Sequence, residues 1–340
     1  MRVAMYYNNS DIRLEELPKP TAGPGELVMK VISSGICGSD VMEWYRIKKA
    51  PIVLGHEVTG EVVEVGEGVD RFMLGDRVVV THHVPCNTCH YCLAGHHTLC
   101  DTLHSTTFDP GGFAEYLRIP AINVDRGTFL LPPEVSYDVG SFVEPLGCAV
   151  RGQRVAKVSP GQSVLVLGSG MSGLLHIMLA KAYGAGRIMA TDITDFRKEA
   201  AAKFGADHVI DARDDVAARV QEVNGRGADV VIVATAAPPA IGQALAAVDR
   251  GGTVLLYALH NPDVSFDLAP RAFMLKGVTL VSSYAAAPVD LELALELVRS
   301  RRVEVEDLIT HRLPLEKTQE GFQLVVKAQD SLKVIVDPTM

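Results

Sequence analysis

The chain has 340 residues, a length typical of two domains, and its 48% hydrophobic and 21% charged content is ordinary for a soluble globular protein. A net charge of −9 argues against a nucleic-acid partner, which needs a basic surface to neutralise phosphates. No segment of signal-peptide type opens the sequence and no run approaches about 18 apolar residues, so we expect a cytoplasmic protein with no membrane partner.

The first 148 residues carry short segments in which apolar and polar residues alternate, separated by glycine and proline. Examples are GEVVEVG at 60–66, DRVVV at 76–80 and AEYLRIP at 114–120. Alternation with a period of two is typical of strands that have one buried face. The pattern therefore predicts an antiparallel, barrel-like β domain.

The middle of the chain alternates short apolar segments with helical patterns of about ten residues. We expect strands at 163–168, 187–192, 207–211, 228–235, 252–259 and 278–284. We expect helices up to about 183 and near 195–204, 213–223 and 238–248. Such alternation predicts a parallel sheet with right-handed crossovers.

The last part of the chain, from about residue 286, starts with a helical pattern. The segment VDLELALELVRS predicts this helix, LITHRLPL follows it, and LKVIVD predicts a final strand. The sequence contains no internal repeat and no low-complexity segment.

Four cysteines in the segment CNTCHYCLAGHHTLC have the spacing C-x2-C-x2-C-x7-C, which indicates a metal site. Four thiolates saturate tetrahedral zinc and leave no position for substrate, so we interpret the site as structural. Ligand type alone leaves an iron–sulfur centre open, whereas the acidic composition disfavours a zinc ribbon that binds nucleic acid. Three histidines in this segment are expected on the loop surface. The cysteines are Cys86, Cys89, Cys92 and Cys100, and the histidines are His90, His96 and His97.

The segment GSGMSG at 168–173 has the pattern G-x-G-x-x-G between an expected strand and an expected helix. An acidic residue, Asp192, ends the next strand 19 positions after Gly173. This context favours a dinucleotide site over a tight turn without a ligand. A carboxylate at Asp192 accepts hydrogen bonds from a ribose and repels a 2′-phosphate, so NAD is favoured over NADP. The candidate cofactor-binding residues are Gly168, Gly170, Met171, Ser172, Gly173, Asp192 and Arg197.

A catalytic zinc needs about three protein ligands and an open position, so a second site must lie elsewhere. The candidates are Cys37 in GICGSD, His56 and Glu57 in LGHEVTGEV, and Glu144 in SFVEPLGCAV. Taken singly, each has a simpler explanation: a buried cysteine, a histidine in a turn, or a solvated glutamate.

Together, the motifs and their order resemble the zinc-dependent medium-chain dehydrogenase/reductase family. The resemblance rests on GICGSD, GHEVTGEVVEVG, the four-cysteine segment and GSGMSG, and it extends from about Val3 to Asp337. EPLGCAV and LITHRLPLEKTQEGF resemble the polyol (sorbitol or iditol) and threonine dehydrogenase branch. The resemblance implies an α/β fold with a GroES-like β-barrel catalytic domain, residues 1–148 with 286–340, and a Rossmann NAD-binding domain, residues 149–285.

The resemblance also implies roles for single residues. Cys37, His56 and Glu57 match catalytic zinc ligands, and Glu144 matches either a ligand or the group that hydrogen-bonds zinc-bound water. Ser39 matches the hydroxyl that hydrogen-bonds the reacting oxygen and passes its proton on.

Asp40 and the remaining cysteines also receive roles. Asp40 is expected to orient His56, because ligand imidazoles usually donate their other N–H to a carboxylate or carbonyl. The four clustered cysteines match the structural zinc site, whereas Cys148 matches no ligand and is expected in the core.

The chain departs from the family pattern at two places. Members commonly carry a histidine three positions after the serine, where it ends a proton relay, but this chain has Met42. A thioether carries no proton, so Glu57 or water is the expected substitute. The branch also tends to have an arginine before a tyrosine that faces the substrate, and here Ser283 precedes Tyr284.

The implied activity is hydride transfer from a secondary, polyol-like alcohol to NAD, giving a ketone, in a homodimer or homotetramer. Each chain is expected to hold two zinc ions, one catalytic and one structural. A cyclitol, amino-cyclitol or threonine-type dehydrogenase of the same family is the alternative. A non-catalytic cofactor-binding protein is the alternative from another class, and the complete set of candidate zinc ligands argues against it.

Overall fold

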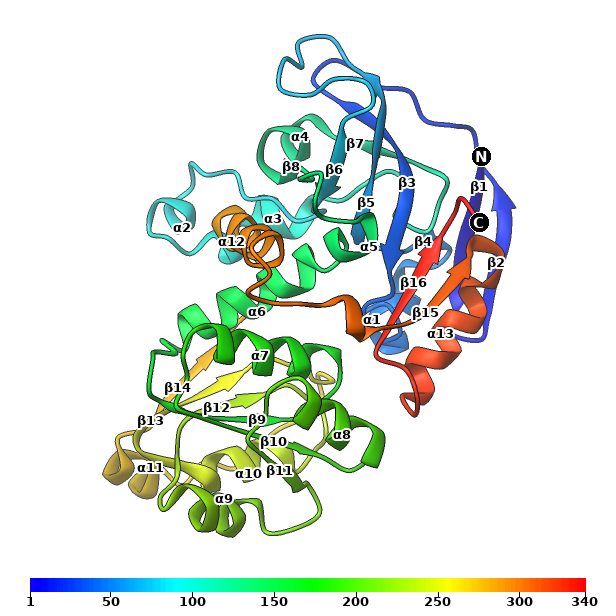
Figure 1. Cartoon of the computed structure of the whole chain (residues 1–340). Coiled ribbons are helices and arrows are strands. Elements are labelled where there is room, and N and C mark those ends of the chain that lie inside the picture. The colour runs from blue at the N-terminus through cyan, green and yellow to red at the C-terminus, as the bar shows by residue number, and fades with distance from the viewer. The chain divides into compact units, whose positions relative to one another are not determined.

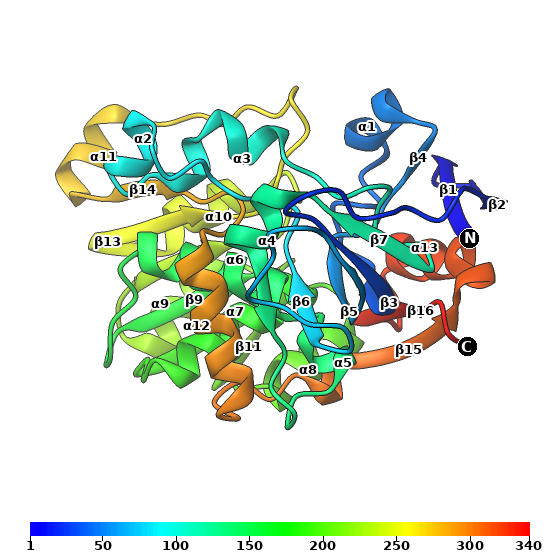
Figure 2. The same cartoon turned by 90° about the horizontal axis from the view of Figure 1, so that it is seen from above.

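The computed structural model describes all 340 residues, and they form two compact units. The first unit consists of Met1–Gly147 and Ala285–Met340, and the second of Cys148–Tyr284. These limits lie one residue from those expected from the sequence. Both termini belong to the first unit, where they lie close together (Figure 1 and Figure 2).

The first unit is built on β-sheet. A seven-stranded sheet has the order β15-β16-β3-β5-β6-β8, with β7 also paired to β3, and a smaller sheet has the order β2-β1-β4. All strand pairs are antiparallel except β15–β16, which confirms the expected antiparallel β domain. The strands are β1 (Arg2–Asn8), β2 (Asp11–Glu16), β3 (Leu27–Gly35), β4 (Ile52–Val53), β5 (Glu57–Val65), β6 (Arg77–Val80), β7 (Tyr116–Ile119), β8 (Thr128–Leu130), β15 (Ile309–Pro314) and β16 (Lys333–Asp337).

Short helices connect these strands, and α6 runs from the first unit into the second. The α-helices are α1 (Glu43–Arg46), α2 (His90–Leu93), α3 (Asp101–Ser105), α4 (Ala121–Gly127), α5 (Tyr137–Gly140), α6 (Val143–Val155), α12 (Pro288–Arg299) and α13 (Thr318–Lys327). Four 3-10 turns are η1 (Ile47–Lys49), η2 (His97–Leu99), η3 (Glu306–Leu308) and η4 (Leu315–Lys317).

The two ends of the chain are joined by a hydrophobic cluster between β1, α13 and the loop before β7. Phe322 of α13 is fully buried, and its ring lies 5.9 Å from that of Tyr6 and 5.8 Å from that of Phe113. Ring separations in this range are favourable for aromatic pairs. The C-terminal segment is therefore part of the core of the first unit.

The second unit is a six-stranded parallel sheet of order β11-β10-β9-β12-β13-β14. All five residues of β9 are buried, as expected for a central strand covered on both faces. Helices cover both faces of the sheet (Figure 1). The strands are β9 (Ser163–Leu167), β10 (Arg187–Asp192), β11 (His208–Asp211), β12 (Ala228–Val233), β13 (Val248–Leu256) and β14 (Thr279–Ser282), and the helices are α7 (Met171–Ala182), α8 (Asp195–Lys203), α9 (Val216–Asn224), α10 (Ala240–Ala247) and α11 (Pro270–Lys276).

This strand order is that of the dinucleotide-binding doubly wound fold. The sequence predicted every strand of the sheet and four of its five helices. It missed α11, a helix of seven residues that buries none of them, too short to show a helical period clearly. None of the helices is both long enough and apolar enough to span a membrane.

We predict that Phe322→Ala destabilises the first unit by about 3 to 5 kcal/mol, because it removes a fully buried ring and leaves a cavity. Trp44, the single tryptophan, lies in the first unit, so its fluorescence during urea unfolding measures this loss. Phe266→Ala, at a side chain 40% exposed in the second unit, is the control and should leave the transition unchanged.

Candidate zinc and dinucleotide sites

The register of three neighbouring strands brings together residues that are far apart in the sequence. Gly35, at the end of β3, pairs with Glu57 of β5 on one side and with Ile335 of β16 on the other. Cys37 follows β3 by two residues, and His56 directly precedes β5. The ligand atoms of Cys37, His56 and Glu57 consequently lie within 4.8 Å of one another.

Asp40 fixes the geometry of this group. One carboxylate oxygen accepts a hydrogen bond from the Cys37 amide at 3.0 Å, and the other lies 3.3 Å from His56 Nδ1. The contact expected between Asp40 and His56 is thus present, and it leaves Nε2 of His56 for a metal ion. Asp40 is fully buried.

The same contacts decide the protonation of His56. Burial by itself lowers the pKa of His56, but the charges of Asp40 and Cys37 outweigh it and hold that pKa well above its usual value. A metal ion must displace a proton from such a histidine, so metal binding at this site weakens as the pH falls.

Glu57 has a partner that the sequence did not predict. Its carboxylate forms a buried ion pair with Lys333 of β16, and the two side chains are 2% and 0% exposed. A Cβ at Gly35 would lie 2.4 Å from both Glu57 Oε2 and Lys333 Nζ, so a larger residue there would have to displace the ends of these two side chains. The sequence signal for this pair was the single lysine inside the apolar strand LKVIVD, because a buried lysine needs a counter-charge.

Two further histidines lie beside the group. The β5–β6 register pairs Val58 with Val80, so His82, two residues past Val80, comes beside His56, with ring centroids 4.8 Å apart. Burial lowers the pKa of His82 well below its usual value and that of His83 to about 4, so both rings are neutral. His82 Nδ1 is buried without a hydrogen-bond partner.

The other candidates are placed as follows. Ser39 Oγ lies 3.4 Å from Cys37 Sγ, close to the group. Glu144 is buried in the first turn of α6 but is not among the residues whose ligand atoms cluster within 4.8 Å. Cys148 was expected in the core but is only partly buried, and it belongs to neither cysteine-containing group.

The four clustered cysteines form a closed donor set. Their sulfur atoms all lie within 4.8 Å of one another, and two of the separations are 3.5 Å (Cys89–Cys92) and 4.0 Å (Cys86–Cys92). Zn–S bonds of about 2.3 Å in a tetrahedron require sulfur separations of about 3.8 Å, so the residues fit zinc. Backbone N–H groups of Thr88 and Cys89 point at Cys86 Sγ and, with the Thr88 hydroxyl, lower the pKa of Cys86 to about 5.

The neighbouring histidines are absent from that donor set. His90 and His96 are exposed and His97 is partly buried, in agreement with a surface loop.

The glycine-rich loop joins β9 to α7. Gly168 has φ = +90°, and a Cβ at Gly173 would lie 1.9 Å from the Gly168 carbonyl oxygen. A side chain at either position would strain the turn or push α7 away from β9. The loop thus leads into the N-terminus of α7, where Met171, Ser172 and Gly173 begin the helix and their N–H groups suit a pyrophosphate.

Asp192 ends β10 and is 6% exposed. It accepts hydrogen bonds from the backbone N–H groups of Ser169 at 3.0 Å and Ile193 at 2.8 Å, so it links the glycine loop to the next strand. Thr194 also donates to the oxygen that Ile193 contacts, through its N–H at 3.0 Å and its hydroxyl at 3.2 Å, so only the oxygen bonded to Ser169 keeps an acceptor position for a ribose hydroxyl. Arg197 borders the loop at Gly170, and its Nε is buried without a hydrogen-bond partner.

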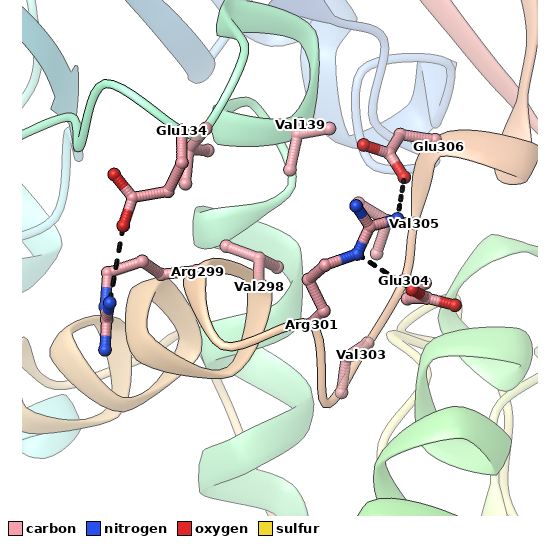
Figure 3. Close-up of a pocket in the computed structure, with 10 residues that line it drawn as sticks. Glu134, Val139, Val298, Arg299, Arg301, Val303, Glu304, Val305 and Glu306 are labelled. Atoms are coloured by element: carbon pink, nitrogen blue, oxygen red, sulfur yellow. Dashed lines mark hydrogen bonds and ion pairs between the residues drawn. The ribbon is translucent and has the colours of Figure 1, made fainter.

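A pocket of the first unit lies between α5, α12 and the segment before β15 (Figure 3). Its two arginines are paired within the pocket: Arg299 lies 3.3 Å from Glu134, and Arg301 lies 3.0 Å from Glu304 and 3.8 Å from Glu306. Both cations are matched by carboxylates, so the pocket presents no charge suited to an anionic ligand.

Comparison with known proteins identifies the class. Residues 23–127 match the alcohol dehydrogenase GroES-like domain, and residues 173–300 match the zinc-binding dehydrogenase domain. Sorbitol dehydrogenase of Bacillus subtilis (strain 168) is 33% identical over 99% of this chain and 97% of its own. L-threonine 3-dehydrogenase of Pyrococcus abyssi (strain GE5 / Orsay) is 37% identical over 92% of this chain and 91% of its own.

A solved structure agrees with these relatives. The 2R,3R-butanediol dehydrogenase from Bacillus subtilis superposes with a TM-score of 0.87 at 30% identity and covers 99% of both chains. The chain therefore belongs to the zinc-binding dehydrogenase family, in its polyol and threonine dehydrogenase branch. It is a zinc-dependent alcohol or polyol dehydrogenase with zinc and a nicotinamide dinucleotide as cofactors, and its substrate is a small alcohol. The alternative of a non-catalytic protein is wrong.

We predict that Lys333→Met lowers the free energy of unfolding by about 3 to 5 kcal/mol, because it leaves the Glu57 carboxylate buried without a partner. The double variant Glu57→Gln with Lys333→Met should recover most of that loss, since no charge is then left unpaired. Urea unfolding followed by Trp44 fluorescence measures both. Equal stability of the single variant and the native protein would contradict the buried pair.

Proposed function

We propose that the protein oxidises a secondary, polyol-like alcohol to a ketone with NAD as hydride acceptor. The observation that carries this proposal is the grouping of Cys37, His56 and Glu57 in a chain that also has a closed four-cysteine set and a dinucleotide loop. The four clustered cysteines alone saturate a zinc ion, whereas the group of Cys37, His56 and Glu57 offers too few ligands to do so. An open coordination position is what separates a catalytic zinc site from a structural one.

In this proposal Cys37 and His56 hold the catalytic zinc, and Glu57 or Glu144 completes the protein ligands. The geometric grouping supports Glu57, whereas its pairing with Lys333 supports Glu144 as ligand or as the acceptor of a hydrogen bond from water. When bound, zinc acts as a Lewis acid toward the alcohol oxygen and the nicotinamide accepts the hydride.

The residues of the chain orient the substrate and the ligands. Asp40 holds the tautomer and direction of His56, and Ser39 supplies a hydroxyl next to the metal group. The polar atoms of Ser39 and His82 suit a substrate with more than one hydroxyl group. His82 Nδ1 in particular lacks a protein partner and is a natural contact for a neighbouring hydroxyl.

The test of this function is a substrate screen with zinc-loaded protein. NADH formation would be measured with sorbitol, butanediol, inositols, L-threonine and propan-2-ol, and metal analysis should find two zinc ions per chain. Preferred oxidation of sorbitol or butanediol supports the proposal. Preference for an inositol or for L-threonine would establish the cyclitol or threonine alternative instead. Oxidation of none of them, in protein that holds two zinc ions, would contradict it.

For the cofactor, we infer NAD rather than NADP, because the Asp192 carboxylate would repel a 2′-phosphate at the end of β10. We predict that Asp192→Ala raises the KM for NAD by about 10-fold or more, as expected for a lost hydrogen bond to a charged group. The preference of the enzyme for NAD over NADP should become smaller. Steady-state kinetics with both cofactors measures this. Asp195→Ala, at a side chain 88% exposed three residues later, is the matched control and should keep the native preference.

A homo-oligomer is proposed from the edge of the second unit's sheet. β14 is the last strand of that sheet, and the segment before it exposes apolar side chains: Met274 is 77% exposed and Leu275 is 70% exposed. An unpaired edge strand beside exposed apolar residues is a surface that proteins usually cover. A second copy, paired about a two-fold axis, would cover both features at once.

We predict that Leu275→Glu shifts the assembly toward smaller species, because it places a charge in this surface. Light scattering after size-exclusion chromatography measures the mass. Leu93→Glu is the control, because it introduces the same charge at a leucine that is 77% exposed in α2 of the first unit. A native protein that elutes as a monomer would refute the proposal.

We also infer a cytoplasmic location. All six cysteines are free, and four of them need to be reduced thiolates to hold zinc. The cytosol keeps thiols in that form.

A further inference from the structure

The hydroxyl of Ser39 has an unexpected neighbour. Met42 occupies the place of the relay histidine and carries no proton, but Arg46, at the end of α1, reaches back to the serine. Arg46 Nε donates to the Ser39 carbonyl oxygen at 3.0 Å, and Arg46 Nη2 donates to Ser39 Oγ at 3.0 Å. The Arg46 side chain is only 14% exposed.

The hydrogen bonds of Ser39 determine where its proton points. A hydroxyl has one hydrogen and two acceptor lone pairs, and Arg46 occupies one of these lone pairs. The hydrogen is then directed at Cys37 Sγ, 3.4 Å away, within the metal group. Arginine does not lose its proton in proteins, so Arg46 cannot accept one from Ser39.

Asp40 keeps Arg46 in place. Arg46 Nη2 lies 3.5 Å from Asp40 Oδ1, and the guanidinium also stacks over the ring of Tyr45 at 4.7 Å. The same Asp40 oxygen contacts His56 Nδ1. Arg46 is therefore tied to the hydroxyl of Ser39 and, through Asp40, to a candidate zinc ligand.

We propose that Arg46 is a positioning residue: it holds the Ser39 hydroxyl so that its hydrogen, which faces Cys37 Sγ, is available as a donor to the reacting oxygen of a bound alcohol. This inference rests on the proposed function. It assigns Ser39 a role different from the first step of a proton relay: the hydroxyl donates to the oxygen, and the proton that the alcohol loses passes to water rather than to Met42 or Arg46. A charged donor on Ser39 Oγ also strengthens the bond that the hydroxyl itself donates.

A purely structural role for Arg46 is the alternative, because its Nε also braces the backbone at Ser39. A double-mutant cycle separates the two roles, since residues that act through each other show non-additive effects. The variants are Ser39→Ala, Arg46→Met and the double variant, with Arg46→Lys as the conservative replacement. Lys48→Met is the control, because it removes one positive charge at an exposed side chain two residues away.

The kinetic part uses the alcohol of the screen that the native enzyme oxidises fastest. We expect Ser39→Ala to lower kcat about 100-fold, the lower range for loss of a positioned polar group in catalysis. Arg46→Met should lower kcat about 10-fold with little change in KM, and the double variant should be no slower than Ser39→Ala. Arg46→Lys should restore part of the loss, and Lys48→Met should match the native enzyme. The proposal would be overturned if the kcat losses of the two single variants multiply in the double variant, or if Arg46→Met has native activity.

A second readout does not depend on activity. The midpoint of urea unfolding, followed by Trp44 fluorescence in zinc-loaded protein, should fall less in the double variant than the sum of the two single shifts. Additive shifts would show that Arg46 and Ser39 are not paired and would overturn the inference by themselves. Native protein that oxidises no alcohol but shows non-additive shifts would contradict the proposed function while the Arg46–Ser39 pair stands.

Discussion

The candidate catalytic group depends on the register of β16, β3 and β5. Gly35 lies between Glu57 and Ile335 in the paired strands, and the absence of a side chain there makes room for the Glu57–Lys333 ion pair. Because side chains alternate along a strand, a slip of one residue in either pairing would turn Glu57 or Lys333 to the other face of the sheet. The sheet that forms the core of the first unit thus also sets the positions of the residues around the metal group.

Charge balance around this group follows from the same arrangement. Asp40 faces Arg46 and His56, and Glu57 faces Lys333, so each of these two buried carboxylates has a cationic partner. A zinc ion at this site would take its balancing charge from Cys37 and from the glutamate that completes its ligands, while His56 would bind as a neutral ring.

The two cysteine-containing sites differ in how completely protein ligands would fill the coordination sphere of a metal ion. In the four-cysteine set the ligands come from one short segment, and backbone N–H groups satisfy the sulfur of Cys86. In the other set Cys37 and His56 lie in loops next to β3 and β5, and Glu57 is the first residue of β5. His82 lies beside them with an unpartnered ring nitrogen. The first arrangement stabilises a loop, whereas the second leaves polar groups for a bound molecule.

The sequence by itself determined what depends on local spacing. The cysteine spacing, the glycine pattern before α7 and the alternation of strands and helices are written in neighbouring residues, so the closed metal set, the dinucleotide loop and both fold types were predictable. The tertiary structure alone decided that Lys333 neutralises Glu57, that His82 lies beside His56 and that Arg46 replaces a relay histidine as the neighbour of Ser39. Lys333 and His82 reach the site through strand pairings between distant segments, and Arg46 reaches it because the loop after β3 folds back. Periodicity in a single segment carries no information about the two strand pairings, and it does not reveal which side chains meet within a loop.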